Sequence, residues 1–252
     1  MDAAEKTLSV LDALGTTGAD GGSRLGSIAA RAQLPKSTVH RILKRLVERG
    51  YARAQGEGVY VLGPRILAMA GGMLDQLDAG PAARAVLREL HADVGHTVHF
   101  AKLSGDEAVY VEKLVDPDLP YQTASRVGGR IALHCTAIGK AILAGMPIEE
   151  ARPLLGRRKL VRRTPNTLVT VAELRAELER VRARRFAIDD EENERNIRCV
   201  GAAALDHRGR PAGAVSVSAL TVELSYDDAM ALGPRVVAAA DALSETLGAR
   251  AA

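Results

Sequence analysis

The chain has 252 residues, of which 47% are hydrophobic and 26% charged, and its formal net charge is +3. This composition supports packed cores and excludes a disordered or fibrous chain, and two cysteines are too few for a disulfide framework. The first residues lack the basic flank and apolar core of a secretory signal, and no apolar run reaches the roughly 20 residues of a membrane span. We therefore expect a cytoplasmic protein with no membrane partner.

Apolar residues repeat at helical spacing in the first quarter of the chain. The repeat predicts helices over residues 4–14 and 25–32, and a third helix from 35 to 50. Two β-prone segments, 51–55 and 59–62, flank a glycine-rich turn and predict a hairpin. Three helices followed by a hairpin are typical of a winged helix-turn-helix domain.

The rest of the chain predicts a linker helix and a mixed domain. Apolar residues at helical spacing over 64–77 predict the linker helix. Pro64 suits its start, and Gly80-Pro81 ends it. Beyond it we expect helices over 82–94, 136–144, 148–155, 171–184 and 226–247, and strands over 97–102, 107–114, 197–206 and 212–219. The fold class is therefore α+β, with an antiparallel sheet in the second domain. The predicted divisions are a winged helix-turn-helix over 1–63, a linker helix over 64–80 and the second domain over 81–252.

Positive charge is concentrated in the first domain. Residues 1–65 hold ten basic and six acidic residues, whereas the remainder is nearly neutral. Basic and hydroxyl side chains lie on the third helix opposite its apolar stripe, a pattern that suits a DNA major groove, although a solvated helix face has the same composition. The order of helix, turn, basic helix and hairpin favours double-stranded DNA. The candidate DNA-binding residues are Lys36, Ser37, Thr38, His40, Arg41, Lys44, Arg45 and the wing residue Arg53.

Three stretches of the chain form recognisable motifs: residues 34–41 (LPKSTVHR), 128–141 (GGRIALHCTAIGKA) and 189–200 (DDEENERNIRCV). They resemble the IclR family of bacterial transcriptional regulators, in which the first matches the turn and recognition-helix start and the other two match motifs of the second domain. The resemblance implies a GAF-like domain that binds a small organic-acid effector, and a homodimer or homotetramer on operator DNA. It also implies a regulator of a catabolic operon, more often a repressor. The positions that carry over as effector-binding are Ala137, Ile138, Asp189, Cys199, Ser216 and Ser218.

Elementary chemistry supports part of this assignment. Ser216 and Ser218 are two residues apart on an expected strand, so their hydroxyls share one face. Unpaired amides at the start of the 136–144 helix can hold a carboxylate. The chain departs from the family's pattern at Ala137 and Asn196, where relatives often have glycine, and these departures bear on the shape of the pocket.

An enzyme is the alternative function. A hydrolase could use Cys199 or a Ser/His/Asp set, but no nucleophile motif such as Gly-x-Ser-x-Gly is present, and an enzyme has no need of the basic first domain. We therefore expect no catalytic residue, with Cys199 as a small hydrophobe in an apolar strand. His91, His96, His99, His134 and Cys135 lack the spacing of a metal site, so no metal or cofactor is expected.

Three charged features have plain structural interpretations. Lys140 is expected to face solvent or another subunit, because its helix is otherwise apolar. The acidic run 189–192 is expected to form a solvated loop in which only Asp189 faces the pocket, with a catalytic carboxylate pair or a cation site as the alternative. The basic cluster 157–163 is expected to be a solvated segment, with contact to DNA or to an acidic ligand as the alternative.

Overall fold

The computed structural model describes residues 1–15, 22–77, 80–105, 107–115, 125–147, 149–151, 153 and 160–249. The chain divides into two compact units, residues 1–76 and 77–252. None of the described helices combines the length and the hydropathy that a membrane span needs.

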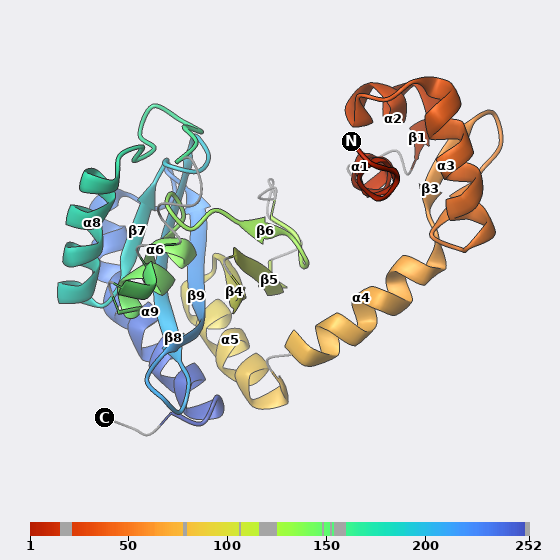
Figure 1. Ribbon diagram of the computed structural model, residues 1–252. Helices are drawn as coiled ribbons and strands as arrows, with labels where there is room; N and C mark the ends of the chain where they lie inside the picture. Colours follow the sequence, from red (N-terminus) through yellow and green to blue (C-terminus); the bar gives the residue numbers. More distant parts are fainter. Residues whose placement is uncertain are drawn as a thin grey trace. The chain divides into compact units, whose positions relative to one another are not determined.

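The first unit is a helical domain with a small sheet (Figure 1). Its core holds the fully buried side chains of Val10, Leu14, Ile28, Val39 and Leu43. The antiparallel sheet has the strand order β1-β3-β2. The elements are α1 (Ala3–Gly15), β1 (Ser23–Arg24), α2 (Leu25–Ala32), α3 (Lys36–Glu48), β2 (Ala52–Ala54), β3 (Val59–Leu62) and α4 (Pro64–Leu77).

A tight turn joins α2 to α3. Gln33 takes a left-handed conformation (φ 54°), and its amide donates to carbonyl oxygens in the last turn of α2. Pro35 precedes the first residue of α3 with a φ of −57°, which suits the start of a helix. Because Val39, Leu43 and Leu46 are buried, the opposite face of α3 is turned to solvent.

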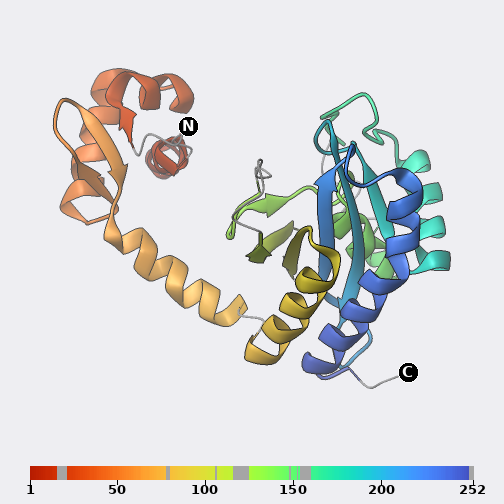
Figure 2. The same ribbon diagram turned by 180° about the vertical axis from the view of Figure 1, so that it is seen from behind.

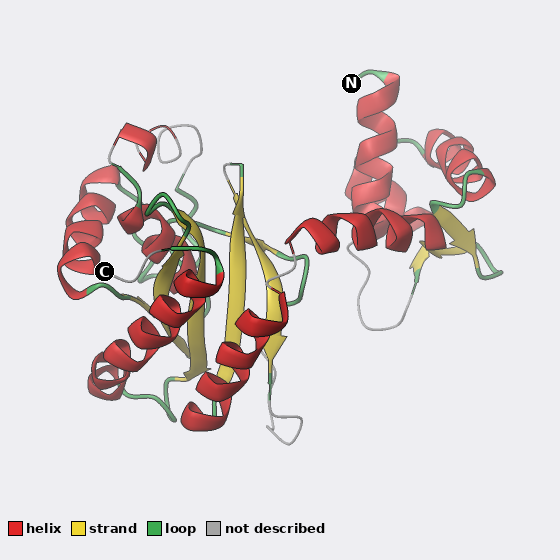
Figure 3. Ribbon diagram, turned by 90° about the horizontal axis from the view of Figure 1, so that it is seen from below, coloured by secondary structure: helices red, strands yellow, loops and turns green. Residues whose placement is uncertain are grey.

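The second unit is built on a six-stranded antiparallel sheet with the order β6-β5-β4-β9-β8-β7. Figure 1 shows α6 and α8 on one face, and Figure 2 shows α5 and α9 on the other. In Figure 3 the strands are seen between these helices. The elements are α5 (Gly80–Val94), β4 (Thr97–Ser104), β5 (Glu107–Leu114), β6 (Arg130–Ile131), α6 (Ala137–Gly145), α8 (Val171–Arg184), β7 (Ala187–Asp190), β8 (Ile197–Leu205), β9 (Pro211–Leu220) and α9 (Tyr226–Thr246).

The predicted fold class is confirmed, and most predicted helices and strands lie within a few residues of the observed ones. The sequence missed β1, β6 and β7, which have only two to four residues each. Most of the helix expected over 148–155 lies outside the described residues.

Two glycines allow the start of α6 to lie close to its neighbours. A Cβ on Gly201 of β8 would come within 2.9 Å of the Ala137 carbonyl carbon, and a Cβ on Gly139 would come within 2.4 Å of the Leu133 Cα. Both contacts are with backbone atoms, which cannot rotate away. The first turn of α6 is therefore fixed against the sheet and against the turn before it.

Substituting Gly201 tests this close contact. We expect Gly201→Ala to lower the free energy of unfolding by about 1–3 kcal/mol, because the added methyl overpacks the junction of β8 with α6. Urea unfolding followed by circular dichroism measures the change. The control is Gly71→Ala in α4, where a Cβ meets no atom within 4 Å and no loss is expected. Equal stability of the Gly201→Ala variant and the parent would show that α6 can move away from the sheet at no cost.

Candidate nucleic-acid interface and effector cavity

The predicted DNA-binding side chains lie on an exposed surface of the first unit. Seven of the eight are on α3, where all but the half-buried Thr38 are exposed, and Arg53 is exposed on β2. Arg45 pairs with Glu48 at 2.9 Å, so part of its charge is balanced on the helix itself. The remaining basic residues of α3 offer an unobstructed cationic surface, the chemistry that phosphate and base contacts require.

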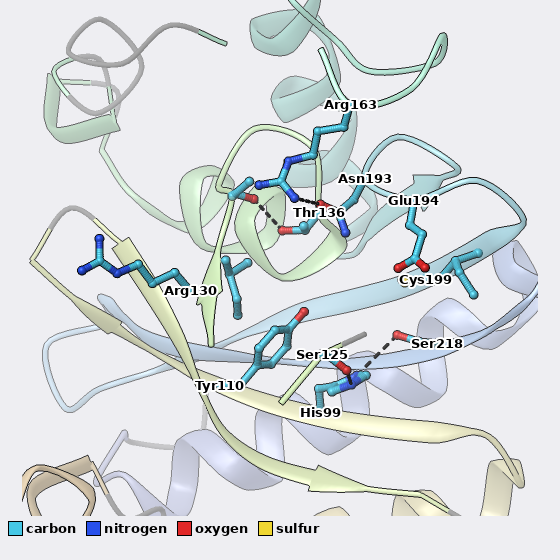
Figure 4. Close-up of a pocket in the computed structure, with 13 residues that line it drawn as sticks. His99, Tyr110, Ser125, Arg130, Thr136, Arg163, Asn193, Glu194, Cys199 and Ser218 are labelled. Atoms are coloured by element: carbon cyan, nitrogen blue, oxygen red, sulfur yellow. Dashed lines mark hydrogen bonds between the residues drawn. The ribbon is translucent and has the colours of Figure 1, made fainter. Parts of the chain in front are cut away.

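The second unit contains a polar cavity of about 280 Å³ on the face of the sheet that α6 covers (Figure 4). Alternation along the strands explains its composition. His99, Cys199 and Ser218 have the same parity as Ala101 and Ala214, which pack against α6 and α8, so their side chains share that face. The described lining residues are His99, Tyr110, Ser125, Arg130, Ile131, Ala132, Thr136, Arg163, Asn193, Glu194, Ile197, Cys199 and Ser218.

His99 forms the floor of the cavity as a neutral imidazole. Its Nε2 lies 2.7 Å from the Ser125 hydroxyl, and its Nδ1 lies 3.4 Å from the Ser218 hydroxyl. Burial, helped by the nearby Lys113 cation, lowers the pKa of His99 to about 3. A neutral ring has one donor and one acceptor nitrogen, so one serine donates to it and the other accepts.

Tyr110 stands beside His99, with the two ring centroids 5.0 Å apart. Burial raises the pKa of the Tyr110 phenol well above its usual value, so the hydroxyl stays protonated. Among the described residues this hydroxyl has no hydrogen-bond partner, and it faces the cavity (Figure 4). The floor is therefore uncharged, and one of its hydroxyl groups is unused.

The opposite side of the cavity is cationic. The Arg163 Nη1 donates to the Oδ1 of Asn193 at 2.9 Å, and no acidic partner of Arg163 is found among the described residues. That bond requires the Asn193 amide oxygen to face the guanidinium, which turns the Nδ2 away from Arg163. Thr136 lies next to this pair as the N-cap of α6, and its hydroxyl accepts from the Gly139 amide at 3.0 Å.

Lys140 is buried and not turned to solvent, which corrects the sequence prediction. Its side chain is about 1% exposed, and its ammonium donates to a carboxylate oxygen of Glu192 and to the Ile188 carbonyl. Glu177 on α8 lies 4.0 Å from the same ammonium. Although its neighbours in sequence are apolar, Lys140 reaches acidic groups that are distant along the chain.

The acidic run 189–192 is likewise not a solvated loop. Asp189 and Asp190 belong to β7, and Glu192 is buried against Lys140. The Asp189 carboxylate accepts from the amide of Glu192 at 2.8 Å and from that of Asn193 at 3.3 Å. Asp190 accepts from Arg198 at 2.6 Å. The run therefore shapes the loop that carries Asn193.

The structure brings two of the six predicted effector residues, Cys199 and Ser218, to the cavity wall. The other four are buried beside the cavity and are not among its lining residues. Ser216 pairs with His99 across the sheet, Ala137 and Ile138 form the first turn of α6, and Asp189 holds the loop after β7. The residues predicted from the sequence do not include His99, Tyr110, Arg163 and Asn193. Strand parity with Ala101 was a signal for His99, and Arg163 belongs to the basic cluster for which contact with an acidic ligand was the alternative to a solvated segment.

Neither cysteine is activated as a nucleophile. Burial raises the pKa of Cys135 to about 12 and that of Cys199 further still, so both are thiols at neutral pH. Within the described part of the chain, no three His, Cys, Asp or Glu side chains are grouped to hold a metal ion.

Comparison with known proteins identifies the family. Residues 3–56 match the IclR helix-turn-helix domain, and residues 71–245 match the C-terminal domain of the bacterial transcriptional regulator IclR. The Escherichia coli transcriptional repressor IclR is 30% identical over 232 residues, which are 91% of this chain and 84% of that protein. The chain belongs to the IclR family of transcriptional regulators, which are not enzymes.

Solved structures have the same fold. The Thermotoga maritima IclR is 29% identical with a TM-score of 0.76, and the match covers 97% of this chain and 98% of that one. An IclR homologue from Microbacterium hydrocarbonoxydans, solved in complex with 4-hydroxybenzoate, is 22% identical with a TM-score of 0.76, covering 98% and 99% of the two chains.

A double-mutant cycle tests the buried ion pair. We expect Lys140→Met to lower the free energy of unfolding by about 3–5 kcal/mol, because it leaves the Glu192 carboxylate buried without a cation. The combined variant Lys140→Met with Glu192→Leu should be more stable than Lys140→Met alone, since it removes the uncompensated charge. Urea unfolding of the single and double variants gives the coupling. Simple additivity of the two substitutions would contradict a direct interaction.

The pH dependence of stability tests the environment of Asp189. Burial is the main cause that raises the pKa of its carboxyl to about 7, although Lys140 acts in the opposite direction. An unfolded aspartate titrates near 4, so between about pH 4 and 7 the folded chain binds more protons than the unfolded one, and its stability falls as pH rises.

Asp189→Asn lacks this titration. Relative to the parent, its free energy of unfolding should therefore rise by on the order of 2 kcal/mol between pH 5 and pH 8. Parallel denaturant titrations at the two pH values measure the difference, in which the titrations of groups distant from Asp189 cancel. A difference that does not change with pH would mean that the Asp189 carboxyl ionises as it does in water.

Proposed function

We propose that this chain is a repressor of a catabolic operon, acting in the cytoplasm as a homodimer or homotetramer on operator DNA and controlled by a small organic acid. The observation that carries the proposal is that one chain combines an exposed cationic α3 with a polar cavity in which Arg163 has no acidic partner among the described residues. The Escherichia coli relative is a transcriptional repressor, which supports repression over activation for this chain.

The first domain reads the operator through α3 in this proposal. Lys36, Ser37, Thr38 and Arg41 are near the start of the helix, the part of a recognition helix that reaches base edges. His40 is on the same exposed surface, and Lys44, Arg45 and Arg53 contact backbone phosphates. Two copies of the domain then read two halves of a pseudo-palindromic site.

The cavity holds the effector. A carboxylate bound beside the Arg163–Asn193 pair receives charge-assisted hydrogen bonds from the guanidinium, and the adjacent start of α6 adds its dipole and the amides of Ala137 and Ile138. Cys199 and Ser218 contact the ligand from the sheet, while Asp189 and Ser216 support the wall from behind. The Microbacterium homologue was solved with 4-hydroxybenzoate, an organic acid of suitable size for such a cavity.

Binding to the chain's own upstream intergenic DNA is the experiment that tests this function. We expect sequence-selective binding that weakens with salt, because neutralised phosphates release counterions, and that one member of a panel of organic acids alters. Competition with unrelated DNA of equal length separates selective from general binding. Absence of selective binding by a folded oligomer, with and without the acids, would overturn the proposal.

Substituting Arg41 tests whether this residue of α3 contacts a base. If Arg41 reads a base, Arg41→Ala should weaken selective binding by about 1–3 kcal/mol, roughly 5- to 150-fold in the dissociation constant, with little change on unrelated DNA. The control is Arg175→Ala, an exposed arginine on α8 in the second unit, which should bind the operator as the parent does. Unchanged selectivity of the Arg41→Ala variant would exclude base contact by that residue.

A further inference from the structure

The polar groups of the cavity fall into two sets on opposite sides (Figure 4). Arg163 and Asn193 occupy one side next to Thr136, while Tyr110 and His99 occupy the other. The first side has a cation, and the second has only neutral groups. The two sides therefore suit different parts of one ligand.

On the cationic side, Arg163 and Asn193 both keep donors that no described residue occupies. The Asn193 Oδ1 is occupied by Arg163, and the Nδ2 has no partner among the described residues. Thr164 and Thr167 fix the position of the Arg163 segment, because their hydroxyls donate to the carbonyls of Glu191 and Glu192 at 2.6 Å. A guanidinium held next to an amide donor provides the charge and the hydrogen bonds that one carboxylate needs.

On the neutral side, the ring nitrogens of His99 are already engaged. Both lie within hydrogen-bond distance of serine hydroxyls, those of Ser125 and Ser218. The Tyr110 hydroxyl has no partner among the described residues. A phenol both donates and accepts, so it pairs with a hydroxyl or a carbonyl group.

The charges around the floor decide against a second carboxylate there. Arg130, the other cation of the wall, is engaged by Glu107 at 3.3 Å, and Lys113 donates to the Ser125 carbonyl at 2.8 Å without lining the cavity. Glu194 adds a negative charge at the rim, close to Cys199 (Figure 4). A carboxylate at Tyr110 would therefore lose its hydration and meet, among the described lining residues, only a cation that already has an acidic partner.

We propose that the effector is a monocarboxylate with an uncharged hydroxyl or carbonyl group at its far end, and that Tyr110 is the residue that selects this group. The inference rests on the proposed function, because it assumes that the cavity is the effector site. A volume of about 280 Å³ limits the ligand to a small molecule.

Two matched series of acids test the proposal by isothermal titration calorimetry on the full chain without DNA. One series is benzoate, 4-hydroxybenzoate and terephthalate, and the other is butanoate, 4-hydroxybutanoate and glutarate. Within each series the far end changes from hydrogen to hydroxyl to carboxylate. In at least one series, we expect the hydroxy acid to bind about tenfold or more tightly than both of the other acids.

Variants assign this preference to named atoms. Tyr110→Phe removes only the hydroxyl, and it should weaken the hydroxy acid about tenfold, to the level of the plain acid, while leaving the plain acid unchanged. Arg163→Gln should weaken the hydroxy acid and the plain acid by a similar factor. Tyr226→Phe, on α9 at the other face of the sheet, is the matched control and should bind all six acids as the parent does.

Three results would overturn the inference: a diacid that binds as tightly as its hydroxy acid, a preference that survives Tyr110→Phe, or no binding by any of the six acids. If selective DNA binding persists in those cases, the regulatory function stands without this inference. If the acids bind as expected but selective DNA binding is absent, the regulatory function fails and the ligand assignment stands.

Discussion

The buried ion pair between Lys140 and Glu192 is the interaction on which the cavity depends. It joins α6 to the loop after β7, across 52 residues of sequence. The loop in turn carries Asn193 and accepts hydrogen bonds from Thr164 and Thr167, which place Arg163. Because a lone buried charge is costly, whereas a bonded pair is tolerated, either partner without the other would destabilise the whole wall. Arg163, which faces the cavity, is thus positioned through the ion pair of Lys140, which does not line the cavity.

The sheet contributes the other half of the cavity through strand alternation. Odd-numbered residues of β4 and β8 and even-numbered residues of β9 face α6, while their neighbours, such as Phe100 and Val215, fill the core under α5 and α9. The same burial that stabilises the sheet keeps His99 neutral. A charged imidazole there would attract a second anion, so desolvation of His99 also shapes what the floor can bind.

Periodicity in the sequence was sufficient to predict the winged helix-turn-helix and most of the second unit, since helices and strands of eight or more residues repeat their pattern several times. Strands of two to four residues contain too little of the pattern. The short β2 and β3 were predicted from the glycine-rich turn between them, whereas β6 and β7 are not joined to a neighbouring strand by such a turn. Lys140 was placed wrongly for a different reason. Helical spacing shows which residues share a face but not which distant carboxylates meet it. Arg163 was missed because it lies in a loop, where side-chain positions follow from tertiary hydrogen bonds alone.

The two sides of the cavity, one cationic and one neutral, indicate how a small ligand can act as a signal. An effector changes a conformational equilibrium only by binding one arrangement more tightly than another. The cationic side of the cavity, Arg163 and Asn193, is held by buried hydrogen bonds to the loop after β7, whereas Tyr110 belongs to β5, three strands away from β8 in the sheet. A ligand that contacts only the cationic side would bind equally well whatever the distance between the two sides. A ligand that bonds to both sides favours the arrangement in which their separation equals its own length. The selectivity of Tyr110 and the response to the effector would then have the same physical origin.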